Sequence, residues 1–552
     1  MVEDKATRSE DLYRAEGEQG RLNEIIKKCQ NCFGLQAHYL LKTSKTNLDK
    51  DGTLRRWTYG EKDEKKSCKT ILMVGETGTG KTALINTIIN YILGVKFEDK
   101  VWFEITNEVT VNDGDEEDTQ TETQTKHMTV YEIYVKEAPF SLIIIDTPGY
   151  GDTRGLKYDQ QIAENLHMLC RSEAGIHEMN AVGLVVKASQ NRLTDSQKYI
   201  FNAVLSLFGK DIEQSIVIFV THSDGAYPTN ALAAIKKAKV PYAQKNNKPV
   251  YFLFNNYKGE AFQAECEENN GSVYRTAWNL GVDSMKKFLE QLEKMQPKSL
   301  KMTKEVLRQR KQLAACVQNL QDRIKMMELK HTELEQTQQA LNDHKKEMER
   351  NQNFEYEVDE AYKEKVPIQQ TEWFWSTKAT CCTVCEENCH YPGCWWVRDL
   401  SWCSVMSGNH CTVCTGKCHY TNHVKEEKIY EQRTRRVKKT HEELKKKYMV
   451  EKGNMGKKES LVSRIQRELN EVEKQKIRLV EEAYQCVMTL EETAMKSDSF
   501  STLLHLDFLI EKMEETWDKV KAQKLRDIQK RADTEYKRAM QMQFAMTMTM
   551  PL

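Results

Sequence analysis

The sequence lacks an excess of either charge, because Lys and Arg together number 82 and Asp and Glu also number 82 among its 552 residues. A chain with no net charge does not attract the negatively charged backbone of nucleic acid, so no nucleic-acid partner is expected. It also lacks any run of eighteen apolar residues, and its start, Met1-Val2-Glu3-Asp4-Lys5, is neither basic nor apolar. Neither a transmembrane segment nor a secretory leader is predicted.

Proline is scarce, with nine residues, while hydrophobic residues make up 39% and charged residues 30% of the chain. This composition is typical of a helix-rich protein with a polar surface. The length exceeds what one ordinary core organises, so several unlike domains are expected.

A complete phosphate-binding loop follows an apolar run early in the chain. Residues 70–74 are typical of a buried strand, and directly after them come Gly75, Glu76, Thr77, Gly78, Thr79, Gly80, Lys81 and Thr82. Glycines let such a backbone wrap round phosphate oxygens, and the helix that begins behind it favours negative charge. We therefore predict binding of a nucleoside triphosphate, with Lys81 on the β and γ phosphates and the Thr82 hydroxyl on Mg²⁺.

A second apolar run, residues 142–145, ends in Asp146-Thr147-Pro148-Gly149. If this run is a strand beside the first, its last residues lie at the same sheet edge as the phosphate loop. Asp146 is then placed to hold Mg²⁺ through water. The Gly149 N–H is placed to contact the γ-phosphate and to report its presence.

The identity of the base is predicted from a later strand, residues 215–220, which is followed by Thr221-His222-Ser223-Asp224. A carboxylate such as Asp224 accepts from the ring N–H and the amino group that guanine has and adenine lacks, so GTP and GDP are the predicted ligands. His222 either lies against the base or is an ordinary loop histidine. Asn255 and Asn256 follow a fifth strand and are predicted at the rim of the same pocket.

An acidic, threonine-rich segment over residues 113–125 separates the first helix from the strand before Asp146. We predict that it is the first switch, with Thr125 closing on Mg²⁺ when γ-phosphate is bound and Thr123 as the next choice. An ordinary solvated loop without a metal contact is the alternative.

These landmarks, in this order, resemble the septin-like branch of the translation-factor class of GTPases. Within it they are most similar to the GIMAP family of immunity-associated nucleotide-binding proteins and to the chloroplast import-receptor (Toc) GTPases. The resemblance rests on the phosphate loop, on the segment Asp146–Thr153 and on Phe254-Asn255-Asn256, and it covers roughly 40% of the chain. It implies a three-layer α/β P-loop GTPase domain and slow conversion of GTP to GDP and phosphate. It further implies that a partner or dimerisation completes the site, since Tyr150 stands where Ras-type GTPases carry a water-positioning glutamine.

Nine of the sixteen cysteines lie between Cys381 and Cys418, within an internal repeat in which two CxxC pairs are each followed four residues later by Cys-His-Tyr. These spacings suit tetrahedral Zn²⁺, and a small segment with little aliphatic core gains folding free energy from a metal. Disulfides and an open catalytic zinc site are the alternatives. The candidate ligands are Cys382, Cys385, Cys389, His390, Cys394, Cys403, His410, Cys411, Cys414, Cys418, His419 and His423.

Apolar residues recur every seventh position before this segment, at Val306, Leu313, Leu320, Met327, Leu334, Leu341 and Met348. A second apolar stripe follows it, at Ile465, Leu469, Val472, Leu479, Ala483 and Leu490. Such stripes predict two helical arms that form an antiparallel coiled-coil hairpin with the zinc module at its tip. Helices folded back on the GTPase domain, or self-association through the same stripes, are the alternatives.

The domains are expected as an N-terminal polar and helical extension (1–64), a P-loop GTPase domain (65–295), a coiled-coil arm (296–372), a zinc module (373–425), a second helical arm (426–540) and a flexible tail (541–552). The predicted function is that of a cytoplasmic GTP-binding protein, a slow GTPase whose nucleotide state controls assembly into a homodimer or higher oligomer, or recruitment of a protein partner through the arms and the zinc module. The alternative is a zinc and coiled-coil scaffold with a structural, rarely hydrolysed GTP.

Overall fold

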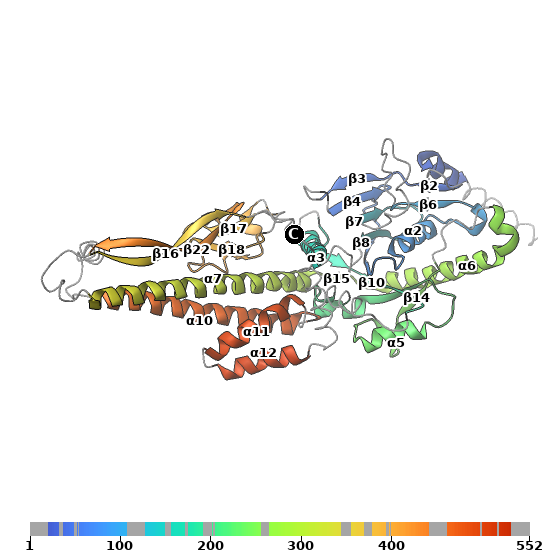
Figure 1. Cartoon of the computed structure of the whole chain (residues 1–552). Coiled ribbons are helices and arrows are strands. Elements are labelled where there is room, and N and C mark those ends of the chain that lie inside the picture. Colours follow the sequence, from blue (N-terminus) through green and yellow to red (C-terminus); the bar gives the residue numbers. More distant parts are fainter. Residues whose placement is uncertain are drawn as a thin grey trace, which may run out of the picture. The chain divides into compact units, whose positions relative to one another are not determined.

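The protein is described here from a computed structural model (Figure 1). The described residues are 20–31, 37–48, 52, 54–106, 127–148, 156–171, 175–190, 201, 205–255, 264–343, 355–368, 378–393, 397, 399–440, 461–496, 500–515 and 518–531. The chain forms two compact units. The first comprises Met1–Glu305, Ala494–Lys496 and Asp533–Leu552, and the second comprises Val306–Thr493 and Ser497–Ala532.

The first unit is built on an eight-stranded sheet. Its strands, in spatial order, are β14 (Tyr251–Leu253), β11 (Ile216–Thr221), β10 (Ala181–Lys187), β5 (Cys68–Gly75), β8 (Ser141–Asp146), β7 (Met128–Ile133), β4 (Leu54–Tyr59) and β3 (Ser44–Asn47). The first five run parallel, whereas β7 is antiparallel to β8 and β3 is antiparallel to β4. This is the α/β P-loop architecture that the sequence predicts.

Helices α2 (Lys81–Ile92) and α6 (Ala264–Lys294) share one apolar cluster with the central strands (Figure 1). Ile85, Ile89 and Phe288 pack there against Ile71 and Met73 of β5. Strands β5, β10 and β11 are buried along almost their whole length, as continuous apolar runs in a parallel sheet require. The first unit further contains α3 (Leu156–Arg171), α5 (Thr229–Lys237) and a small sheet of β1 (Gln30–Asn31), β2 (His38–Leu40) and β6 (Trp102–Glu104).

In the described part of the second unit, the helices that belong to it wholly or mainly are α7 (Lys301–Asp343), α10 (Leu461–Thr493), α11 (Phe500–Glu515) and α12 (Lys519–Arg531). Helices α7 and α10 lie side by side (Figure 1), and the thiols of Cys316 and Cys486 hydrogen-bond between them. In the described part of the seven-residue stripe, Val306, Leu313 and Leu320 are buried. A coiled coil as such stays a prediction.

The prediction of uninterrupted helical arms over 296–372 and 426–540 is wrong at two places. Residues Glu355–Pro367 form strand β16 and Lys428–Thr440 form β22, which pair antiparallel over their full length. Tyr356 and Val358 alternate with glutamates, and this period of two is a strand signal that the high charge of the segment obscures. Both residues pack against Ala340 of α7 and Val437 of β22. The ribbon of β16 and β22 therefore covers one face of this part of α7.

The cysteine-rich module is connected through this ribbon and contains β17 (Ala379–Cys382), β18 (Glu387–His390), β19 (Met406–Ser407), β20 (His410–Cys411) and β21 (His423–Glu426). It does not sit at the tip of a hairpin as predicted. Glu387 of β18 binds Arg323 at 2.9 Å, well before α7 ends at Asp343. The ribbon runs back from the end of α7, so the module packs on the middle of that helix.

Within the described ranges, every helix falls short of the combined length and apolarity that a bilayer crossing requires.

Replacement of Arg323 by Ala should loosen the module, because Arg323 is buried and its guanidinium bonds Gln475 of α10 at 2.7 Å as well as Glu387. Removal of one partner from such a buried pair costs about 3 kcal/mol. We expect amide hydrogen exchange over residues 379–426 to speed up about a hundredfold.

The matched control is Arg436→Ala, which removes an exposed ion pair with Glu357 at 2.8 Å on the ribbon. Exposed pairs contribute at most about 1 kcal/mol, so exchange in the module should change less than about fivefold. Equal effects of the two substitutions would contradict the assignment of Arg323 as the anchor.

Candidate functional site

The phosphate loop lies between the end of β5 at Gly75 and the start of α2 at Lys81. Gly75 has to be glycine, because a Cβ there would lie 2.6 Å from the carbonyl oxygen of Val185. Gly78 and Gly80 adopt left-handed φ angles of 76° and 82°. Helix α2 carries no acidic residue in its first turn, so its positive end faces the loop without competition from a carboxylate.

Two opposite charges are buried at this sheet edge. Lys81 Nζ donates to the carbonyl oxygens of Gly75 at 2.9 Å and Glu76 at 3.1 Å. Asp146 ends β8 and pairs in register with Met73 of β5, which brings it next to the loop. Its side chain is buried, and neither carboxylate oxygen has a hydrogen-bond partner among the described residues.

Burial shifts the ionisation of both groups. Loss of solvent lowers the pKa of Lys81 to about 8, against the attraction of Asp146 and Glu76. The same effect raises the pKa of Asp146 to about 7, against the attraction of Lys81. Each ion is thus poorly compensated by the protein, which is the condition in which added phosphate and metal charge is most stabilising.

These side chains fit a magnesium nucleotide. The Asp146 oxygens are the hard, unpartnered donors that Mg²⁺ prefers, directly or through water, and Thr82 stands one residue into α2 beside Lys81. The hydrogen bonds of Lys81 within the described residues go to backbone carbonyls of the loop, and a phosphate oxygen would be a stronger partner.

Thr221 has a role that the sequence did not reveal. It ends β11 and is fully buried, and its hydroxyl donates to Thr79 O at 2.7 Å. The side chain thus fixes the phosphate loop. Thr147 fixes the strand before the loop in a similar way, since its hydroxyl donates to Met73 O at 2.8 Å. Both links join residues far apart in sequence, so no local motif could indicate them.

The predicted base-recognition residues follow two neighbouring parallel strands. Asp224 comes after β11 and is exposed, and its Oδ1 accepts from Ala226 N at 2.9 Å. Asn255 follows β14 and is half-buried, and the two loops are joined by Ser223 N donating to Phe254 O at 3.0 Å. His222 has a φ of 53°, and partial desolvation of its ring, together with the nearby charge of Lys187, lowers its pKa.

Five predicted site residues, Thr123, Thr125, Gly149, Asn256 and Cys394, lie outside the described residues.

The cysteine-rich module brings metal-ligand atoms together in two groups. One consists of Cys382, Cys385, Cys414 and Cys418, and the other of Cys389, Cys411, Cys414 and His423; within each group the ligand atoms lie within 4.8 Å of one another. His423 Nδ1 contacts His419 O at 3.1 Å, while its buried Nε2 has no partner among the described residues. A tautomer fixed in this way leaves Nε2 as a metal ligand, so the residues fit zinc.

The other predicted zinc ligands are placed elsewhere. His390 Nδ1 contacts Cys403 Sγ at 3.3 Å, as a separate pair. His410 and His419 have their rings stacked edge to face, 5.3 Å apart, and belong to neither group. All described cysteines are free thiols, so the disulfide alternative finds no support in the described part of the chain.

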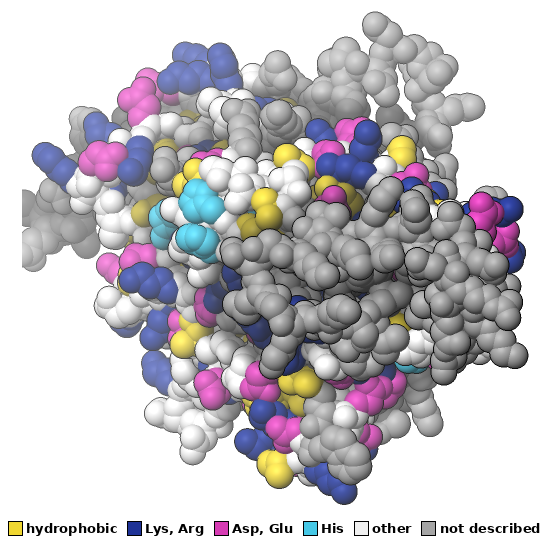
Figure 2. Space-filling model, turned by 90° about the vertical axis from the view of Figure 1, so that its left-hand side faces the viewer, with side chains coloured by type: hydrophobic (Ala, Val, Ile, Leu, Met, Phe, Trp, Pro, Cys, Tyr) yellow, Lys and Arg dark blue, Asp and Glu magenta, His cyan; other side chains and the backbone are white. Residues whose placement is uncertain are grey.

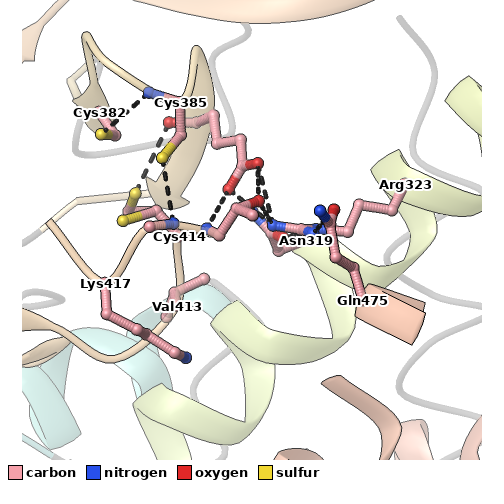
Figure 3. A network of polar contacts seen from close by, with 12 residues as sticks. Asn319, Arg323, Cys382, Cys385, Val413, Cys414, Lys417 and Gln475 are labelled. Carbon is pink, nitrogen blue, oxygen red and sulfur yellow. Dashed lines mark hydrogen bonds and ion pairs between the residues drawn. The ribbon is translucent and has the colours of Figure 1, made fainter. Parts of the chain in front are cut away.

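Figure 3 shows how the module is fixed, with Cys382, Cys385 and Cys414 next to the network around Arg323. Glu387 links the two, because it binds Arg323 and also accepts from Thr415 N at 2.9 Å. Lys417 adds an ion pair with Glu482 of α10 at 2.6 Å. Thr415 and Lys417 lie between Cys414 and Cys418, so the ligand loop itself is held by both helices.

On the face drawn in Figure 2, the Lys and Arg side chains of the described residues are mingled with Asp and Glu rather than gathered in a separate basic area.

Part of the chain matches a known protein family. Residues 69–265 match the model of the AIG1 family. No curated protein matches the sequence.

Solved structures with similarity include Toc33 from Arabidopsis thaliana in complex with Mg²⁺ and GMPPNP, at 13% identity over 40% of this chain and 87% of that chain, with a TM-score of 0.24. Toc33 with GDP and Mg²⁺ matches at 16% identity over 40% and 86%, with a TM-score of 0.23. The translation elongation factor SelB from Methanococcus maripaludis with the GTP analogue GppNHp matches at 11% identity over 42% and 36%, with a TM-score of 0.24. The fold assignment rests on the sheet topology and the family match.

Substitution of Thr221 by Val should weaken GTP binding, because Val keeps the shape but leaves Thr79 O without its buried donor. A loss of about 1–2 kcal/mol corresponds to about a tenfold to thirtyfold rise in Kd. Thr221→Ser retains the hydroxyl and should bind nearly as the unaltered chain does. Equilibrium titration with a fluorescent GTP analogue measures both, and equal affinities for the two variants would contradict the positioning role.

Substitution of Asp224 by Asn tests the base pocket. The remaining side-chain oxygen can still accept from Ala226 N, while the new amide donor faces the guanine amino group unfavourably. We expect the preference for GTP over ATP to fall at least about a hundredfold, and xanthosine triphosphate, which carries a carbonyl at that position, to bind better than GTP. Competition titrations with the three nucleotides measure this, and an intact guanine preference would refute the assignment.

Proposed function

We propose that this chain, whose residues 69–265 form a GTPase domain of the AIG1 family, is a GTP-binding switch with slow turnover. Its nucleotide state controls assembly with further copies or recruitment of a protein partner. The observation that carries the proposal is the buried pair of Lys81 and Asp146 at the carboxyl edge of the sheet, each lacking the compensation that magnesium nucleotide provides.

The proposed roles of the residues that contact nucleotide or metal are those that the sequence predicts. Lys81 neutralises charge on the transferring phosphoryl group, and Thr82 and Asp146 hold Mg²⁺, whose chemistry is to neutralise phosphate charge. Gly149 senses the γ-phosphate, Thr125 closes the first switch and Asp224 selects guanine. Thr221 and Thr147 keep the loop in place through their bonds to Thr79 O and Met73 O.

The second unit is proposed as the part that binds the partner. Its module holds zinc through the cysteine groups, and Val384, Trp402 and Val424 are exposed apolar side chains on it. Apolar side chains exposed on a small, rigidly held module favour contact with another protein. Free thiols throughout the described residues agree with a cytoplasmic setting.

Steady-state GTP hydrolysis per chain, measured over about a hundredfold range of protein concentration, tests the switch. If a second copy completes the site, specific activity should rise at least about tenfold across the range, since a positioned catalytic group contributes that much or more. Lys81→Ala is the blank, because it removes the phosphate contact without altering the second unit.

A flat, low rate would contradict self-activation. In that case nucleotide content after purification decides between the remaining functions. Bound GTP that survives prolonged incubation would favour a scaffold with structural nucleotide, whereas bound GDP would indicate a GTPase that waits for an outside activator.

A further inference from the structure

We propose that residues 379–426 hold a binuclear zinc cluster in which the thiolate of Cys414 bridges two metal ions. The inference concerns the second unit alone and is independent of the GTPase function. Cys414 belongs to both of the ligand groups described above. Two tetrahedral zinc sites need eight ligand positions, and the two groups together offer seven residues. Sharing one thiolate supplies the eighth position.

The ligands are exchanged between the two copies of the repeat. In the first group, the CxxC pair of the first repeat, Cys382 and Cys385, is completed by Cys418 of the second. In the second group, the pair Cys411 and Cys414 is completed by Cys389 of the first repeat. These two sets of three cysteines occupy equivalent positions in the two copies of the repeat. Each metal site is therefore complete only when both copies are folded together. The fourth positions differ, since His423 completes the second group and Cys414 the first.

The sulfur positions are those of a metal cluster rather than of disulfides. Cys385 Sγ and Cys418 Sγ lie 3.6 Å apart. Two thiolates on one tetrahedral zinc are separated by about 3.8 Å, given Zn–S bonds of about 2.3 Å, whereas a disulfide needs about 2.05 Å. Four donors converge on one centre in each group, which pairwise cross-linking does not explain.

Backbone N–H groups surround the sulfurs as they do around metal-bound thiolates. Cys385 N donates to Cys382 Sγ at 3.3 Å, and Gly416 N to Cys385 Sγ at 3.3 Å. In the second repeat, Val413 N donates to Cys411 Sγ at 3.3 Å, and Cys418 N to Cys414 Sγ at 3.3 Å. Such donors stabilise sulfur that carries negative charge, which is the form that binds metal.

Gly416 lies against the sulfurs of two residues of the first group. A Cβ at this position would lie 3.0 Å from Cys418 Sγ and 3.3 Å from Cys385 Sγ. A side chain there would have to push apart two ligands of the same group. The glycine is therefore explained by the cluster, and His423, with its buried Nε2 unpartnered and its Nδ1 on a backbone carbonyl, supplies the non-sulfur ligand.

The first experiment needs no mutation. The full chain is loaded with ¹¹³Cd in place of zinc, and its metal content and ¹¹³Cd spectrum are recorded. We expect two metal ions per chain, two resonances, and a scalar coupling between them transmitted through the shared sulfur. One metal per chain, or two resonances without coupling, would overturn the bridge.

Serine substitutions then assign the ligands. Cys414→Ser should shift both cadmium resonances and lower the zinc retained against a competing chelator at both sites, by about tenfold or more each. Cys382→Ser should remove or shift one resonance and leave the other in place. If Cys414→Ser alters a single site, the bridge is refuted.

Two controls distinguish the bridge from a simpler pair of closed sites. Cys403→Ser changes a buried cysteine that belongs to neither group, and Cys394→Ser changes the cysteine that holds, in the first repeat, the place of His423 in the second. Both variants should keep two coupled resonances. Loss of one metal from the Cys394 variant would show that this residue, rather than Cys414, completes the first site.

Discussion

The first unit depends on two buried charges, Lys81 and Asp146. They lie at one edge of its sheet, and the protein neutralises them incompletely. Among the described residues, the Lys81 ammonium donates to two carbonyl oxygens of its own loop, and Asp146 accepts no hydrogen bond. Such groups are costly in a sheet whose central strands are almost wholly apolar and buried. The surrounding structure keeps them in place, since Thr221 and Thr147 bind the loop and the strand beneath it. The cost is offset when a ligand brings phosphate and metal charge to this edge.

The nucleotide half of the chain was predictable because its signals are local. The phosphate loop is eight consecutive residues, and Asp146 and Asp224 each follow an uninterrupted apolar strand, so the parallel sheet brings them to one edge. The bond from Thr221 to Thr79 was not predictable, because it joins residues 142 positions apart that share no motif. The family resemblance predicted a GTPase domain, and the match of residues 69–265 to the AIG1 family agrees with that prediction.

The second unit was predicted less well, for reasons that lie in its composition. Strands β16 and β22 carry so many charged residues that the sequence gives little sign of their alternation. Once paired, they satisfy these charges across the ribbon, as Arg435 does with Glu360 and Arg433 with Glu364. The two groups of candidate metal ligands lie in the one segment that the sequence indicates, but their grouping depends on an exchange between the repeats. Spacing alone cannot indicate this, since it treats each repeat as self-contained.

The return of the ribbon along α7 also fixes the order in which the chain can fold as it is synthesised. Glu355 of β16 pairs with Thr440 of β22, and Cys389 joins Cys411 only after the second repeat has left the ribosome. Until then the face of α7 around Arg323 and Ala340 lacks the ribbon and the module that cover it, and the first repeat holds thiols whose partners in each group have not yet been made. The growing chain must therefore keep the apolar stripe of this helix out of contact with other nascent proteins until the second repeat is complete.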